Sequence, residues 1–98
     1  IYTVKINSEM MSPTIKIGDT VNAVKVDNTN SDGIYILINE IEGKNIIWIK
    51  RLFLQENNKI LSRCDNPNIP DFVLSKETIL KNKLILKVFS LMITVDTV

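Results

Sequence analysis

The sequence predicts a mostly β domain. Ile, Val, Leu and Thr dominate the chain, whereas Ala, the strongest helix former, occurs once. Asn, Asp, Gly and Pro interrupt the apolar segments at short intervals, which is typical of turns between strands. These two observations together favour several short strands over helices.

The apolar segments predict seven strands, separated by polar turns. The expected strands are Tyr2–Ile6, Thr20–Val26, Gly33–Asn39, Asn45–Leu54, Lys59–Ser62, Phe72–Leu74 and Leu84–Thr94. The expected breaks are Asp27–Asp32, Glu42–Lys44, Glu56–Asn58 and Asp65–Pro70.

Local signals refine some of these breaks. Asn57 and Asn58 stand between two apolar segments, and because Asn tolerates positive φ they predict a tight hairpin. Ser12–Ile15 has the composition of a single helical turn. Gly18 and Asp19 predict a structural turn before the second strand.

Length and charge limit the possible classes of protein. A chain of 98 residues forms a single domain, here residues 1–98. Its net charge is +1, with 12 basic and 11 acidic residues, which gives no reason to expect nucleic-acid binding through this domain. No apolar run reaches the ~20 residues that span a bilayer, so we expect no membrane segment.

Residue types that are missing or rare exclude further classes. The chain has no His, which removes His-based catalytic triads and the commonest metal ligand, and we expect neither a metal nor a cofactor. Cys64 is the only cysteine, so no internal disulfide forms and a reducing cytoplasm is the expected setting. The chain begins at Ile1 without an initiator Met, so we expect a fragment of a longer protein.

The last expected strand is apolar on both faces. Strict alternation puts Leu84, Leu86, Val88 and Met92 on one face, and Ile85, Phe89, Leu91 and Ile93 on the other. A strand of this kind is covered on both sides, either by its own chain or by a partner. We expect a homodimer that forms through Leu84, Leu86, Phe89 and Leu91.

Four short motifs in order resemble a known family. Met10–Ile15 is followed by Gly18-Asp19, and the segment Ile49–Leu52 comes about 40 residues later. Between and after them stand "DGIYIL" (Asp32–Leu37) and "DNPNIPDF" (Asp65–Phe72). This order resembles the Ser/Lys self-cleaving domains of LexA-like and lambda-type phage repressors and of UmuD. The resemblance covers about Val4 to Ile93 and implies small, strongly bent β-sheets, as in signal peptidases.

The same resemblance assigns the catalytic positions. The family motif places a nucleophilic Ser where this chain has Met10, and its general base corresponds to Lys50. A thioether has no proton to give up, so Met10 cannot form an acyl-enzyme. We therefore expect Met10 to occupy a vacated nucleophile position and Lys50 to be a vestigial base. This favours a domain that is not an enzyme over one that is.

Several alternatives remain open at this stage. Ser8 or Ser12 could act as the nucleophile with Lys50 in a live self-cleaving peptidase. Lys50 could instead lay its stem on Trp48 and reach solvent with its ammonium group. These residues also have purely structural interpretations. Met10 and Met11 would fill gaps in the core, and Trp48 with Phe53 would belong to the core. Asp65-Asn66-Pro67 would form a turn with a local Asx bond.

The leading functional expectation follows from the resemblance. It is a non-cleaving oligomerisation and regulatory domain of a prokaryotic or phage transcriptional repressor, of the kind that controls an SOS response or a bacteriophage. DNA would be bound only by a helix-turn-helix domain upstream of Ile1. A signal-peptidase-like enzyme is a third expectation, and it would require a membrane anchor.

Overall fold

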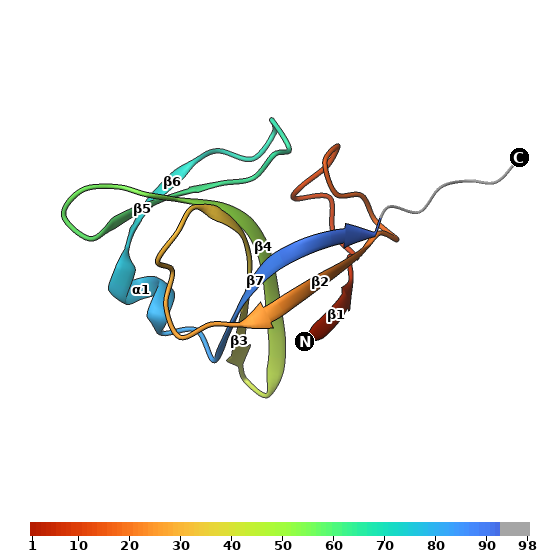
Figure 1. The fold of residues 1–98 in the computed structure, drawn as a ribbon, viewed down its shortest axis with the longest axis horizontal. Coiled ribbons are helices and arrows are strands. Elements are labelled where there is room, and N and C mark those ends of the chain that lie inside the picture. Colours follow the sequence, from red (N-terminus) through yellow and green to blue (C-terminus); the bar gives the residue numbers. More distant parts are fainter. Residues whose placement is uncertain (93–98) are drawn as a thin grey trace, which may run out of the picture.

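One antiparallel sheet of seven strands forms the domain. The computed structural model describes residues 1–92, and its strands follow the order β1-β2-β7-β3-β4-β5-β6 (Figure 1). The elements are β1 (Tyr2–Lys5), β2 (Thr20–Lys25), β3 (Gly33–Ile41), β4 (Lys44–Leu54), β5 (Lys59–Arg63), β6 (Phe72–Ser75), α1 (Lys76–Leu80) and β7 (Leu84–Met92). All seven expected strands are therefore confirmed, and each described end lies within two residues of its predicted position. The predicted Ile93 and Thr94 lie outside the described residues.

The arrangement into several small sheets is a prediction that the structure corrects. Every strand pairs with its neighbour in a single sheet, because β7 joins the β1–β2 pair to β3. The sheet curves strongly, so that β5, β6 and α1 stand on one side of the molecule and β1 and β2 on the other (Figure 1). The mostly β class is confirmed, and the only helix among the described residues has five residues.

Two hairpins turn through residues with positive φ. Asn57 and Asn58 have φ values of 59° and 58°, which confirms the tight turn predicted between β4 and β5. Glu42 and Gly43, at 52° and 78°, connect β3 to β4 in the same manner. Two successive positive φ values match the right-handed twist of the flanking strands, so these turns fix the register of β3, β4 and β5.

The helix α1 was not predicted, although its start carries a recognisable signal. The hydroxyl of Ser75 accepts a hydrogen bond from the N–H of Thr78 at 3.2 Å, which is the usual N-cap contact. Glu77 in the first turn adds a favourable charge. Ile79 is fully buried and anchors this short helix to the sheet.

Two clusters of apolar side chains form the core, one on each face of the central strands. β4 contributes Ile49 to the first cluster and Leu52 to the second, as alternation along a strand requires. The first cluster contains Ile6, Met11, Ile15, Val21, Ala23, Ile36, Ile49 and Leu86. The second contains Tyr35, Leu37, Leu52, Ile60, Ile79 and Ile85.

A β-bulge in β7 changes the predicted face assignment. Asn22 pairs with Ser90 and Ala23 with Val88, so Phe89 is an extra residue on the β7 side. Beyond it, Leu91 pairs with buried Val21 and lies on the face of the first cluster, not on the face of Ile85 as alternation predicted.

Burial in the core distinguishes the four residues of the expected dimer contact, which stays a prediction. Leu86 is fully buried in the first cluster, and Leu84 packs against that cluster. Both side chains are therefore committed to this chain's own core. Phe89 is 55% exposed and Leu91 is 39% exposed, so these two remain accessible to a partner.

The contrast between Leu86 and Phe89 gives a stability prediction. Leu86→Ala removes a fully buried side chain and should lower the free energy of unfolding by about 2–5 kcal/mol. Phe89→Ala should change it by less than about 1 kcal/mol in the monomer, because Phe89 already contacts solvent. Urea denaturation of both variants measures the difference, and equal losses would contradict the two-cluster description.

Candidate functional site

The segment that carries the first motif forms a compact loop between β1 and β2. The N–H of Ile6 donates to the carbonyl of Asp19 at 2.8 Å, and the N–H of Gly18 donates back to Ile6 at 2.9 Å. Within the loop, Ile15 N–H donates to the Met11 carbonyl at 2.8 Å. This bond closes one turn, but the predicted helical turn is not a helix, and Met10 to Thr14 form hydrogen-bonded turns.

Both methionines of this loop fill the core, as predicted. Met11 is fully buried in the first cluster, and Met10 is half-buried and packs against it. The backbone around them is tied to the loop after β5. Asp65 N–H donates to the Met11 sulfur at 3.5 Å, and Asn66 N–H donates to the Met10 carbonyl at 3.1 Å.

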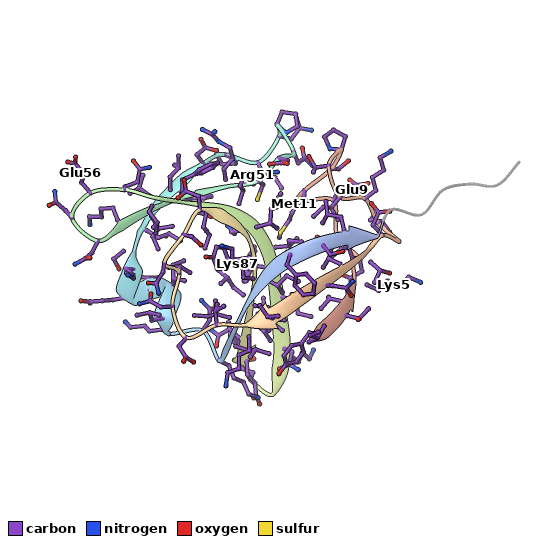
Figure 2. All side chains as sticks on the ribbon, in the orientation of Figure 1. Lys5, Glu9, Met11, Arg51, Glu56 and Lys87 are labelled. Atoms are coloured by element: carbon purple, nitrogen blue, oxygen red, sulfur yellow. The ribbon has the colours of Figure 1, made fainter. Side chains whose placement is uncertain are left out.

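Three polar side chains clamp this loop to the sheet. Arg51 on β4 donates to both carboxylate oxygens of Asp65, from Nε at 3.0 Å and from Nη2 at 2.8 Å. Thr14 at the end of the motif donates its hydroxyl to the same carboxylate at 2.6 Å. Figure 2 shows Arg51, Met11 and Glu9 in the same part of the molecule. Asp65 therefore connects β4, the motif loop and the β5–β6 loop.

The charges in this clamp support one another. The hydrogen bond from Arg51 is the main reason that the pKa of Asp65 lies below its ordinary value, and the Thr14 hydroxyl and the Arg51 charge act in the same direction. The same bond raises the pKa of Arg51.

The turn at Asp65–Pro67 was predicted with a local Asx bond. Asn66 makes this bond, because its side-chain oxygen accepts from the N–H of Asn68 at 3.0 Å.

Lys50 lies on the opposite face of β4 from the first cluster. Its ammonium group sits 5.2 Å from the centre of the Trp48 ring and 5.6 Å from that of Phe72. This matches the interpretation in which the lysine stem packs on Trp48. Trp48 itself is 41% exposed, so the prediction that it belongs to the core is wrong.

The predicted catalytic partners do not contact Lys50. Among residues 1–92, no hydrogen bond, ion pair or ring contact joins Lys50 to Met10, Ser8 or Ser12. Met10 packs against the first cluster, whereas Lys50 borders the second. The roles of Met10 as a vacated nucleophile position and of Lys50 as a vestigial base stay predictions.

Cys64 is the next candidate nucleophile in this region. It is 6% exposed and follows β5 directly, before the clamp residue Asp65. Burial raises the pKa of its thiol, with the nearby Asp65 and Asp71 charges adding to the effect, while the positive charge of Lys50 lowers it. Burial dominates, so the thiol stays protonated at neutral pH and is a poor nucleophile.

The hydroxyl of Ser62, which no sequence motif indicates, lies on the same face of the sheet as Lys50. Ser62 pairs with Leu52, two residues from Lys50 along β4. Its Oγ has no hydrogen-bond partner within the described part of the chain. The side chain is 1% exposed, however, so no substrate bond could reach it. Position on the strand and burial together exclude it as a working nucleophile.

Comparisons with family models, curated proteins and solved structures return no match to this chain. Over residues 1–92, no helix has the length and apolar character needed to cross a membrane. In the same range no three His, Cys, Asp or Glu side chains gather in a way that could hold a metal ion.

The clamp gives a pH-dependent prediction. Asp65→Asn should lower the free energy of unfolding by about 1–2 kcal/mol at pH 7, because the bidentate contact is partly shielded from solvent. The pKa of Asp65 is lower in the folded chain than the unfolded value of about 3.9. The stabilisation is therefore complete above about pH 4 and is lost as the pH falls through the folded pKa. Urea denaturation from pH 7 down to pH 3 should show the gap between wild type and variant closing.

Asp71→Asn is the matched control. Arg63 and Asp71 form the same kind of pair at 2.8 Å, but their side chains are 48% and 40% exposed. Solvent screening should make the loss smaller than at Asp65. Equal losses at the two positions would show that the Asp65 pair is an ordinary surface contact.

Proposed function

We propose that this chain is a non-cleaving oligomerisation and regulatory domain of a prokaryotic or phage transcriptional repressor. The observation that carries the proposal is a thioether, Met10, at the nucleophile position of a motif whose Met, Pro and Thr correspond to Met11, Pro13 and Thr14. Thr14 of that motif and Arg51 next to Lys50 are both engaged in the Asp65 clamp. In this proposal, the residues around the nucleophile position are kept because they stabilise the fold, whereas Met10 supplies no nucleophile.

The chemistry of a Ser/Lys pair explains why this combination is inert. A lysine acts as a general base only when a hydroxyl lies within hydrogen-bond reach and the amine is neutral. Met10 offers no proton, and the ammonium of Lys50 lies against the Trp48 and Phe72 rings.

Dimerisation is the activity that we assign to β7. Its first part pairs with β3 from Leu84 to Lys87, whereas the part from Val88 onward pairs only with β2 among the described residues. An unpaired strand edge is a template for a second strand. Phe89 and Leu91 lie on this stretch and are exposed, which supports a contact between two copies there.

Dimerisation gives the domain its role in regulation. A DNA-binding domain upstream of Ile1 would bind one half-site, and joining two chains makes the second half-site contact intramolecular. Affinity for a two-fold symmetric operator then rises without any base contact from this domain. The nearly balanced charge of the chain fits that indirect role.

Self-cleavage tests the proposal. The protein with its upstream segment should remain intact at about pH 10, where an ordinary lysine approaches its pKa. Met10→Ser restores a hydroxyl but leaves a space in the first cluster, so at most partial cleavage is expected. Mass spectrometry follows the products, and Met10→Ser combined with Lys50→Ala is the control that should not cleave. Cleavage by wild type that Ser8→Ala or Ser12→Ala abolishes would overturn the proposal.

The dimer contact gives a separate prediction. Phe89→Glu places a charge at the unpaired edge of β7 and should convert the dimer to monomer, as measured by light scattering at high micromolar concentration. Ile41→Glu is the control, because Ile41 is 52% exposed in the β3–β4 hairpin, outside β7. A wild-type monomer, or a Phe89→Glu variant that stays dimeric, would exclude this contact.

A further inference from the structure

A cavity of about 180 Å³ opens beside Lys50. Buried Leu37 and Ile79 form its apolar floor, since they are only 4% and 1% exposed. Trp48 and Leu74 add apolar walls from β4 and β6. The cavity is therefore built by three parts of the fold, the β3–β4 pair, β6 and α1.

Lys50 supplies the one charge in the lining of this cavity. The other polar side chains are already committed, because Thr78 contacts the Ser75 hydroxyl at 2.8 Å and the Asn82 amide donates to the Ile79 carbonyl at 2.8 Å. Within residues 1–92, Lys50 forms no ion pair with a carboxylate. The cation is thus available to an anion that enters the cavity.

The position of Lys50 favours an anionic group attached to an apolar body. Its ammonium lies 5.2 Å from the centre of the Trp48 ring and 5.6 Å from that of Phe72, and these rings exclude part of its water shell. A carboxylate beside a partly desolvated ammonium gains a charge-assisted hydrogen bond. The apolar floor then takes the rest of the ligand out of water.

The volume of the cavity matches an apolar body of about one ring. A buried apolar cavity of about 150 Å³ accommodates benzene. The 180 Å³ beside Lys50 therefore suits a six-membered ring with a short substituent. Two larger depressions on the domain offer a less suitable cation. The one of about 600 Å³ lies at the exposed β4–β5 hairpin, where Glu56 stands beside Lys59 in the lining. In the one of about 360 Å³, Lys87 already donates to the Ser31 hydroxyl.

We propose that this cavity binds a small carboxylate that carries a single apolar ring, with the ring on Leu37 and Ile79 and the carboxylate on Lys50. Arylacetates have the required size and charge. About ten heavy atoms at the efficiency of ordinary ligands give a Kd of about 6 mM. The binding site does not depend on the repressor role, and it would give a domain that does not cleave itself a means of responding to a metabolite.

Trp48 makes the test direct, because it is the only tryptophan of the chain and lines the cavity. Titration of wild type with phenylacetate should change the Trp48 fluorescence in a saturable manner. The neutral isostere phenylacetamide should bind about five- to tenfold more weakly, because the charge-assisted bond is lost. Phenethylammonium should not bind.

Two lysine variants complete the test. Lys50→Met keeps the length of the side chain and should weaken phenylacetate binding to the level of phenylacetamide. Lys44→Met, at the exposed start of the same strand, should leave binding unchanged. No saturable change with phenylacetate, equal affinity for the acid and the amide, or unchanged binding by Lys50→Met would each overturn the proposal. The ligand series on wild type decides the matter even if Lys50→Met fails to fold.

Discussion

The pair between Arg51 and Asp65 is the contact that holds the motif loop to the sheet. Asp65 receives two bonds from Arg51, at 3.0 and 2.8 Å, and one from Thr14 at 2.6 Å, and its own N–H reaches the Met11 sulfur. Three segments that are far apart in the sequence therefore depend on one carboxylate. Bidentate charge-assisted bonds fix orientation as well as distance, which explains how a loop without a helix stays ordered.

The residues that bond Asp65 differ from the residues that the resemblance assigns to catalysis. Thr14 and Arg51 belong to the two segments that resemble a Ser/Lys peptidase, and both have a structural partner. Met10 packs into the first cluster, and Lys50 turns to the other face of β4 toward two aromatic rings. The contacts that hold this loop therefore involve neither a nucleophile nor a base, and the proposed loss of a nucleophile at Met10 would leave them intact.

All seven strands could be predicted from the sequence, since alternation and turn residues are local properties. Asn57 and Asn58 specified their turn because few residues adopt positive φ. The bulge at Phe89 could not be predicted, because it arises from the pairing of β7 with β2. Trp48 was misplaced for a similar reason, since a strand pattern does not tell which face is covered. Within the candidate site, the position of Met11 in the core could be predicted. The Arg51–Asp65 contact could not, because it joins residues 14 positions apart and depends on the register of the β4–β5 hairpin.

The measurement that tests the central claim most directly is a double-mutant cycle between Arg51 and Asp65. The claim is that this pair acts as one unit, so removal of either side chain should remove most of the shared stabilisation. Arg51→Met, Asp65→Asn and the double variant, compared by urea denaturation at pH 7, should give a coupling energy of about 1–2 kcal/mol. Additive losses, with a coupling energy near zero, would contradict the account, because the loop would then be held by its backbone hydrogen bonds and apolar contacts without this pair.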